Sequence, residues 1–346
     1  IIFIYVKEVK KLDGNNFFTS FFLFLVMQPP FMIRVVLTLL VLPILFSCAR
    51  GNVDNNNAKT QNDTLAINVA VYPSLDALPL MLGNDWGILD SLGVAVKIHV
   101  YRSQIDAEKA LAEGKVDVAM SDLFRVGWWQ WQKKPVRFAF VTRRRMNIVP
   151  NKALRITNVA QLDDRMIALS RFSLDDYFCD KLEAMLLKKK GQILRPQINS
   201  VELRAKMLES GQLDAAVLGQ QQTYKVNQRK FAELKVATDI TDGFAGFAFN
   251  TNSYAVKHKR RQMRKLYVAY NIAANKIRKM RELHDISETT KVALFLDAGT
   301  LSRIKPKEDF MLAGKNEFSF AEEAVDWLKK RGAVGESYNG DTIVVE

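Results

Sequence analysis

The sequence predicts an α/β protein of two similar lobes, because apolar strands alternate with helical segments and one helix-strand unit occurs twice. The stretch 107–122, AEKALAEGKVDVAMSD, is matched 97 positions later by 204–219, RAKMLESGQLDAAVLG. In each copy a helix is expected to end at a glycine, Gly114 or Gly211, before a buried strand. Two copies are too few for a solenoid, so the repeat favours two lobes.

Each copy also carries a signal for the start of its helix. Ser103 with Asp106 has the spacing of a capping box, and Asn199 with Glu202 repeats it in the second copy. We therefore expect Ser103 and Asn199 to cap the two helices.

The order of the remaining elements predicts how the chain passes between the lobes. Strands are expected at 65–74, 94–101, 136–142, 166–170 and 246–252, and helices at 79–85, 128–131, 174–189, 253–284, 286–298 and 318–330. The chain is expected to leave the first lobe near Arg143 and return near Phe244, which gives two hinge crossings. The first lobe then comprises 65–145 and 244–346, and the second comprises 146–243. Each lobe is expected to hold a mainly parallel sheet flanked by helices.

The N-terminal residues 1–48 are expected to lie outside these lobes. Met32 begins a short positive segment, and an apolar run of 12 residues leads to Ser47 and Cys48, which is the pattern of a secretory signal with its start at Met32. The stretch 45–48 resembles a bacterial lipobox, which implies a lipid on Cys48. The alternatives are an ordinary signal or a membrane anchor.

Two neighbouring segments follow from this interpretation. Residues 1–31 become an upstream extension, although the apolar segment 17–27 leaves room for a longer anchor. Residues 49–64 are polar and without periodicity, which predicts a flexible tether.

The chain is strongly basic, and much of the excess lies in one segment. The formal net charge is +13, and 257–281 contains ten Lys or Arg and no Asp or Glu. The secretory signal and the lack of a recognition motif argue against nucleic acid as a partner. The segment is either a solvated helix face or a surface that attracts anionic lipid head groups or an acidic permease.

Metal and cysteine chemistry are not indicated. The three histidines, at 99, 258 and 284, have no metal-ligand spacing, and Cys179 has no cysteine partner within the expected lobes. We expect Cys179 to be a small buried residue, and we expect no metal, no cofactor and no Cys/His catalytic pair.

Several motifs resemble one family. These are the segments 79–80 with 84–89, 110–119, 121–122 and 320–332. From Ile67 to about Tyr338 the sequence resembles type II periplasmic binding proteins. The similar branch serves ABC importers of sulfonates, taurine, nitrate and thiamine-precursor pyrimidines. The resemblance implies a ligand held between two lobes.

The same location follows from the physics of open α/β sheets. Ligands lie beyond the carboxyl ends of the strands, where turns lead into helix N-termini with free N–H groups. Four such turns supply the candidate ligand-binding residues, which are Tyr72, Ser74, Ser121 and Asp122 in the first lobe and Ser170, Arg171, Phe172, Ser173, Gly219 and Gln220 in the second.

Each of these candidates also has a structural interpretation. Ser74, Ser121 and Ser173 are either helix caps or ligand contacts. Arg171 either binds an anionic group or pairs with Asp175.

The aromatic and basic residues near these turns leave the same choice open. Tyr72 and Phe172 either stack on a planar ligand or close the cleft. The tryptophans within 128–131 are expected to bury at least one ring against the first lobe. The arginines 143–145 are either a solvated hinge or an attractor of anions.

The predicted function is that of a cell-envelope lipoprotein, facing the periplasm or the exterior. It would capture a small anionic or polar planar solute by hinge closure and deliver it to an ABC permease driven by its ATPase. We expect a lipid-anchored monomer with no enzymatic activity. One alternative is a non-transport sensor or adaptor. The other is an enzyme of the pyrimidine-precursor or menaquinone-pathway type on the same fold.

Overall fold

The structure is a computed structural model that describes residues 66–186, 192–227, 231–234, 238–315 and 318–344. These residues belong to one compact unit, Gln61–Glu346. The signal segment, Cys48 and the tether 49–64 lie outside the described residues. Within the described ranges no helix is both long and apolar enough to cross a membrane.

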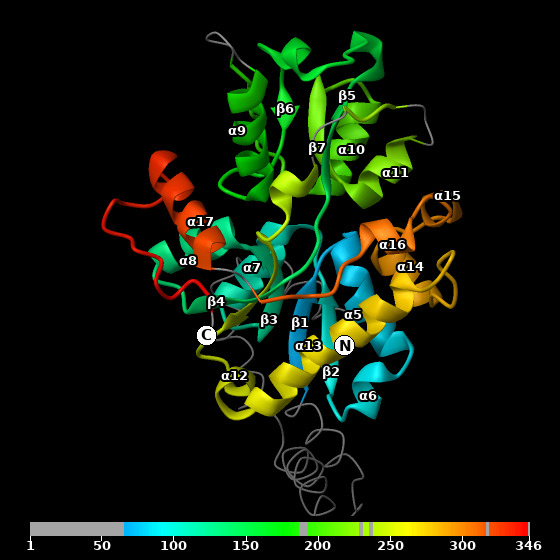
Figure 1. The fold of residues 1–346 in the computed structure, drawn as a ribbon, viewed down its shortest axis with the longest axis vertical. Helices are drawn as coiled ribbons and strands as arrows, with labels where there is room; N and C mark the ends of the chain where they lie inside the picture. Colours follow the sequence, from blue (N-terminus) through cyan, green and yellow to red (C-terminus); the bar gives the residue numbers. More distant parts are fainter. Residues whose placement is uncertain (1–65, 187–191, 228–230, 235–237, 316–317, 345–346) are drawn as a thin grey trace, which may run out of the picture. The chain divides into compact units, whose positions relative to one another are not determined.

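The larger sheet has five strands in the order β2-β1-β3-β8-β4, and Figure 1 labels all of them except β8. The strands are β1 (Ile67–Val71), β2 (Val96–Val100), β3 (Val118–Asp122), β4 (Val136–Val141) and β8 (Ala245–Asn250). Strand β1 pairs in parallel with β2 and β3, whereas β8 is antiparallel to β3 and β4. The antiparallel strand is therefore the one on which the chain returns to this sheet.

The smaller sheet has three strands in the order β5-β7-β6. They are β5 (Met146–Pro150), β6 (Ile167–Ala168) and β7 (Ala215–Gly219). Strand β7 is parallel to β6 and antiparallel to β5. The sequence analysis assigned no strand to β5, because Asn147 and the final proline interrupt its apolar pattern. The Asn147 side chain is nevertheless buried and donates hydrogen bonds to Gln220 and Thr223.

The repeated unit has the same structure in both lobes, as predicted. Helix α7 (Gln104–Ala112) precedes β3, and helix α10 (Val201–Glu209) precedes β7. Gly114 and Gly211 follow these helices with φ of 73° and 78°. Residues with a Cβ atom rarely adopt this left-handed backbone conformation, which explains why both copies have a glycine here.

The helix caps agree with the prediction in one copy and differ by one residue in the other. Ser103 caps α7 and accepts a hydrogen bond from the Asp106 backbone. The cap of α10 is Ser200, so the assignment of Asn199 was wrong. The Asn199 side chain instead accepts a hydrogen bond from Ser170.

Both copies of the repeat carry an aspartate at the same position, and both side chains bond to the neighbouring strand. The Asp117 carboxylate accepts a hydrogen bond from the Asn68 backbone N–H at 2.8 Å. Asp214 accepts one from the Met166 backbone N–H at 2.9 Å. Each copy therefore ties its own strand to the neighbouring parallel strand in the same way.

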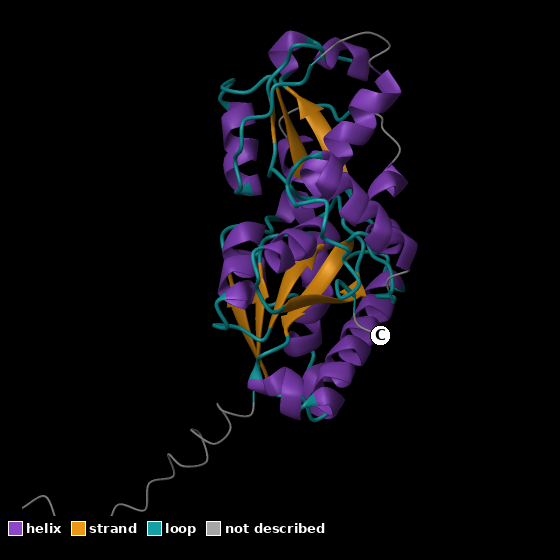
Figure 2. Ribbon diagram, turned by 90° about the vertical axis from the view of Figure 1, so that its left-hand side faces the viewer, coloured by secondary structure: helices purple, strands orange, loops and turns teal. Residues whose placement is uncertain are grey.

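Helices surround both sheets, as seen in Figure 2. They are α5 (Leu78–Asp85), α6 (Ile88–Ser91), α8 (Leu123–Trp131), α9 (Leu174–Leu186), α11 (Gln220–Asn227), α12 (Tyr254–His258), α13 (Arg260–Arg278), α14 (Glu288–Ala293), α15 (Ala298–Leu301), α16 (Pro306–Asp309) and α17 (Phe318–Lys330). The single helix expected over 253–284 is two helices, because the backbone of Lys259 between α12 and α13 is not helical.

The chain crosses between the two sheets twice, from β4 to β5 and from the short helix η4 (Thr238–Thr241) to β8. The two crossings lie side by side. The Thr241 hydroxyl donates to the carbonyl of Arg144 at 3.1 Å, and Arg143 pairs with Asp242 at 2.6 Å. Arg143 thus holds the two crossings together.

A buried aromatic cluster joins helices of the two lobes next to these crossings. The Phe124 ring on α8 stacks on Tyr177 of α9 and on Phe244, with centroids 4.6 and 5.2 Å apart. The Trp327 ring of α17 meets Phe124 edge to face at 5.0 Å. Because aromatic rings bury large apolar areas, this cluster stabilises the contact of α9 with α8 and α17.

Gly246 on β8 is closely packed against β4. A Cβ atom there would overlap the carbonyl oxygen of Phe140 and the ring of Phe138, where the β4 register shifts. We expect Gly246→Ala to lower the free energy of unfolding by about 3 kcal/mol, measured by denaturant titration.

The matched control is Gly314→Ala. A Cβ at that position meets no atom within 4 Å, so we expect a change of less than about 0.5 kcal/mol. Equal effects of the two substitutions would contradict the packing argument.

Candidate functional site

A small cavity lies where turns of the two lobes meet. Four predicted residues line it, namely Tyr72 and Ser74 after β1, Ser170 after β6, and Gly219 at the end of β7. Its volume is about 20 Å³, which is little more than the space for one water molecule. The carboxyl ends of parallel strands from both sheets therefore meet at a closed, almost filled site.

The carboxylate of Asp122 joins the two lobes at this site. Asp122 caps helix α8, since its side chain accepts from the Arg125 backbone N–H at 2.9 Å. Its other oxygen accepts from the Gln104 amide at 2.6 Å and from the Leu174 backbone N–H, in the second lobe, at 3.2 Å. The side chain is fully buried, so these bonds replace its hydration.

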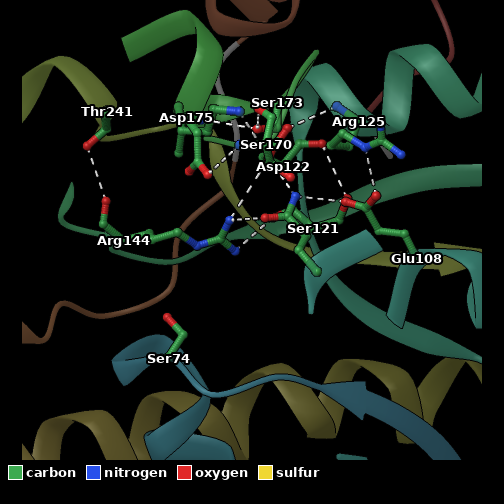
Figure 3. Close-up of polar contacts among 12 residues, drawn as sticks. Ser74, Glu108, Ser121, Asp122, Arg125, Arg144, Ser170, Ser173, Asp175 and Thr241 are labelled. Atoms are coloured by element: carbon green, nitrogen blue, oxygen red, sulfur yellow. Dashed lines mark hydrogen bonds and ion pairs between the residues drawn. The ribbon is translucent and has the colours of Figure 1, made fainter. Parts of the chain in front are cut away.

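The side chain of Arg144 fills the space between the predicted turns (Figure 3). Its guanidinium donates to Gln104 at 2.8 Å, to the Ser121 carbonyl at 3.2 Å and to Asp76 at 3.3 Å. The same group lies 5.3 Å from the centre of the Tyr72 ring. Only 6% of Arg144 is exposed, so this arginine belongs to the interior of the site.

A second buried ion pair supports the first-lobe side of the site. The Glu108 carboxylate accepts from Ser121 Oγ and from Arg125 Nε, each at 2.8 Å, and from the Trp129 indole at 3.2 Å. Ser121 therefore binds Glu108, and its neighbour Asp122 provides the helix cap. The Trp129 ring packs against the main hydrophobic core, as predicted for the tryptophan segment.

The second lobe contributes its own buried pair. Arg204 of α10 contacts the Asp175 carboxylate at 2.7 Å and donates to the Val217 carbonyl at 2.6 Å. The Nε atom of Arg204 is buried and has no hydrogen-bond partner within the described part of the chain. Gln222 bridges the lobes, because its amide donates to the Pro73 carbonyl at 3.1 Å.

The charged groups at the site do not balance. There are four buried carboxylates, Asp76, Glu108, Asp122 and Asp175, and three buried guanidiniums, Arg125, Arg144 and Arg204. Burial, followed by the nearby Glu108 carboxylate, raises the pKa of Asp122 to about 6, although Arg144 and the hydrogen bonds oppose the shift. Burial also raises the pKa of Tyr72 well above its usual value.

Three of the predicted residues at or near the cavity form hydrogen bonds within the protein. Ser173 Oγ donates to the Ser170 carbonyl at 2.7 Å and accepts from the Asp175 backbone N–H, as a capping hydroxyl does. Gln220 begins α11, and its side chain accepts from Asn147 at 3.0 Å. Ser74 Oγ donates to Asp76 and makes no cap bond.

Arg171 and Phe172 lie apart from this group. Arg171 is exposed, with its guanidinium 5.4 Å from the centre of the Phe172 ring, and neither residue lines the cavity. The alternative partner of Arg171 is also engaged elsewhere, because Asp175 pairs with Arg204. The roles assigned to all ten candidates remain predictions.

Four residues that line or support the cavity were not predicted, namely Asp76, Gln104, Glu108 and Arg204. Asp175 was considered only as a partner of Arg171, and the role of Arg144 was left open. One signal was present in the repeat. Glu108 and Arg204 are charged residues on the otherwise apolar faces of α7 and α10. A charge at a core-facing helical position requires a buried partner, and both residues have one.

Cys179 is fully buried on α9, as expected, and burial raises the pKa of its thiol. Among the described residues no group of His, Cys, Asp and Glu could hold a metal ion.

The raised pKa of Asp122 predicts a pH dependence of stability. The folded protein binds this proton more tightly than the unfolded chain, whose aspartate pKa is about 4. The contribution of Asp122 to the free energy of unfolding is thus expected to decrease as the pH rises from about 4 to about 6. The variant Asp122→Asn should lose this slope, measured as its difference from the natural protein in denaturant titrations across that range.

Asp90→Asn is the matched control, because Asp90 is exposed on α6. The same loss of slope in the control, or an unchanged slope in Asp122→Asn, would show that Asp122 is not the titrating group.

No family model matches this sequence, and a search of curated proteins finds no match. Solved structures do match. The alkanesulfonate-binding protein SsuA from Xanthomonas axonopodis pv. citri, bound to MOPS, is 13% identical with a TM-score of 0.64, over 81% of this chain and 96% of that one. The aliphatic sulphonate-binding SsuA from Escherichia coli is 12% identical with a TM-score of 0.64, over 81% and 97%.

A third match has a different ligand in its name. The periplasmic nitrate-binding protein NrtA from Synechocystis PCC 6803 is 12% identical with a TM-score of 0.63, over 80% of this chain and 84% of that one. At such identities the similarity establishes the fold alone. The chain has the two-lobed α/β fold of the periplasmic binding proteins, and it resembles structures of the sulfonate- and nitrate-binding branch.

Proposed function

We propose that this protein captures a small solute between its two lobes and delivers it to the permease of an ABC-type importer. The observation that carries this proposal is the polar site at which turns of both lobes meet, beside two paired crossings. In α/β sheets this is where ligands bind. The matched solute-binding structures have the same fold, which supports the proposal.

Capture requires the lobes to separate and close again. Bonds between the lobes must then break, among them those from Leu174 to Asp122 and from Gln222 to Pro73. Further bonds join the lobes beside the site, such as Tyr177 to Glu323 and Tyr224 to Asp309. The crossings at Arg143 and Arg144 are the natural hinge, because the chain passes between the sheets there. A solute that bridges both lobes would stabilise the closed state through contacts that the open state lacks.

The lining favours one of the two solute classes that the sequence left open. The Tyr72 ring and the amides of Gln104 and Gln222 offer a flat surface with donors and acceptors. An anion would find both guanidiniums of the lining already paired, because Arg144 contacts Asp76 and Arg204 contacts Asp175. The exposed Arg171 does not line the cavity. We therefore propose a polar planar solute.

The remaining features of the proposal concern the setting of the protein. They are a lipid on Cys48, a start at Met32, a tether over 49–64, a location in the cell envelope and a monomeric state. We propose no catalytic step. Cys179 is buried and its thiol pKa is raised, so this cysteine is not suited to act as a nucleophile.

A sensor or adaptor is the second candidate, and two observations favour it. The cavity of about 20 Å³ leaves little space for a solute. The Arg144 guanidinium already bonds to Gln104, which a solute would need as a partner. The aromatic cluster around Phe124 also joins the lobes without a solute. Such a protein would remain closed and present a constant surface to a partner.

A thermal melt of the full chain against small solutes tests capture. The panel contains aminopyrimidines and other polar heterocycles, with alkyl sulfonates, taurine and nitrate as anions. A solute that binds only the folded protein adds about 2.7 kcal/mol of stability at a hundredfold excess over its Kd. We expect a heterocycle to raise the melting temperature. We also expect Gln222→Leu to weaken its binding about tenfold, because the amide faces the site from the second lobe.

Arg171→Gln is the control, since that side chain lies outside the cavity lining, and it should leave the Kd unchanged. Small-angle scattering on the same samples separates the two candidates. A solute-dependent decrease in the radius of gyration supports capture. A flat panel with an unchanging radius would reject capture and favour the adaptor.

A further inference from the structure

A second and larger pocket lies on the five-stranded lobe. Its volume is about 510 Å³, and four cationic side chains line it together with apolar ones. We call it the basic pocket, and its cations are Arg137, Lys257, Arg260 and Arg264. Phe249 and Met263 are among its apolar residues. The volume is within the range of small-ligand sites.

The charge of the basic pocket is not compensated by the residues that line it. No carboxylate is among its lining residues, and none of its four cations forms an ion pair with a described carboxylate. The interlobe site differs in this respect, since Arg125, Arg144 and Arg204 all contact carboxylates there. Four neighbouring cations without counterions attract an anion.

The helix that carries two of these cations is not stabilised by them. Helix α13 begins at Arg260 and has no acidic residue in its first turn. Cations at a helix N-terminus oppose the helix dipole, which favours anions at that end. The placement of Arg260 and Arg264 therefore disfavours the isolated helix and favours a bound anion.

The strand register places the basic pocket at the end of the larger sheet where β1 begins. Ile67 starts β1 at the same edge as Val96 of β2, and Val118 at the start of β3 pairs with Phe249. Only β3 separates β1 from β8, so the start of β1 lies about 10 Å from the strand that carries Phe249. In Figure 1 this end of the strands lies beside α12, on the side of the lobe away from the three-stranded sheet.

We propose that the basic pocket binds the phosphate of an anionic phospholipid headgroup. The cations would hold the phosphate, while Phe249 and Met263 would contact the glycerol and the first acyl carbons. This edge would then face the membrane, and the interlobe site, at the opposite ends of the strands, would face away from it. The inference uses the envelope location from the proposed function and does not depend on solute capture.

The test is a calorimetric titration of the full chain with dihexanoyl-phosphatidylglycerol below its micellar concentration. We expect Arg260→Gln combined with Arg264→Gln to raise the Kd about 30-fold. Each cation near an anionic lipid lowers the Kd about fivefold. The matched control is Lys279→Gln with Arg281→Gln, which removes the same charge at and beyond the other end of α13. The control should change the Kd less than threefold.

Folding of the variants is checked by thermal melts. Removing cations from the N-terminus of α13 should leave the melting temperature unchanged or raise it. Lys257→Gln, outside α13, is a second variant that should weaken lipid binding on its own.

Other results would overturn the proposal. Equal weakening in the pocket and control variants would indicate diffuse charge attraction. Equal affinity for dihexanoyl-phosphatidylcholine would remove the role of the anion, and equal affinity for inorganic phosphate would indicate a soluble ligand. Tighter binding of a glutamate-rich peptide would point to an acidic protein surface.

Discussion

The buried carboxylate of Asp122 is the interaction on which the relation of the two lobes depends. It ends β3, caps α8 and accepts a hydrogen bond from the first residue of α9 in the other lobe. A buried charge is tolerated only when donors surround it, and here those donors come from both lobes. Separation of the lobes would expose this carboxylate to water, which hydrates it well. In the structure the carboxylate is instead hydrogen-bonded by Gln104 in one lobe and by Leu174 in the other.

The two ends of the five-stranded sheet differ in how their cations are paired. At the carboxyl ends of the strands, Arg144 is buried against the carboxylates of Asp76 and Asp122. Cations such as Arg137 and Arg260 gather at the other end around the basic pocket. The four cations of the basic pocket therefore lie apart from the interlobe site.

Local patterns predicted most of the fold because each pattern is satisfied by near neighbours. The glycines at 114 and 211 and the alternation of apolar and helical segments depend on backbone geometry within a few residues. Strand β5 was missed because it is specified by long-range pairing with β7 and by hydrogen bonds from Asn147 to α11. The cap of α10 was displaced by one residue because Ser170, from a distant turn, binds Asn199.

The sequence by itself determined the two-lobed α/β architecture, the two crossings and the turns that meet between the lobes. Only the tertiary structure decided how those turns are used. The Arg144 side chain points into the site, and Arg171 lies outside it. Arg204 pairs with Asp175. The physical reason is that helix and strand periodicity is local, whereas a buried charge selects its partner by distance in space.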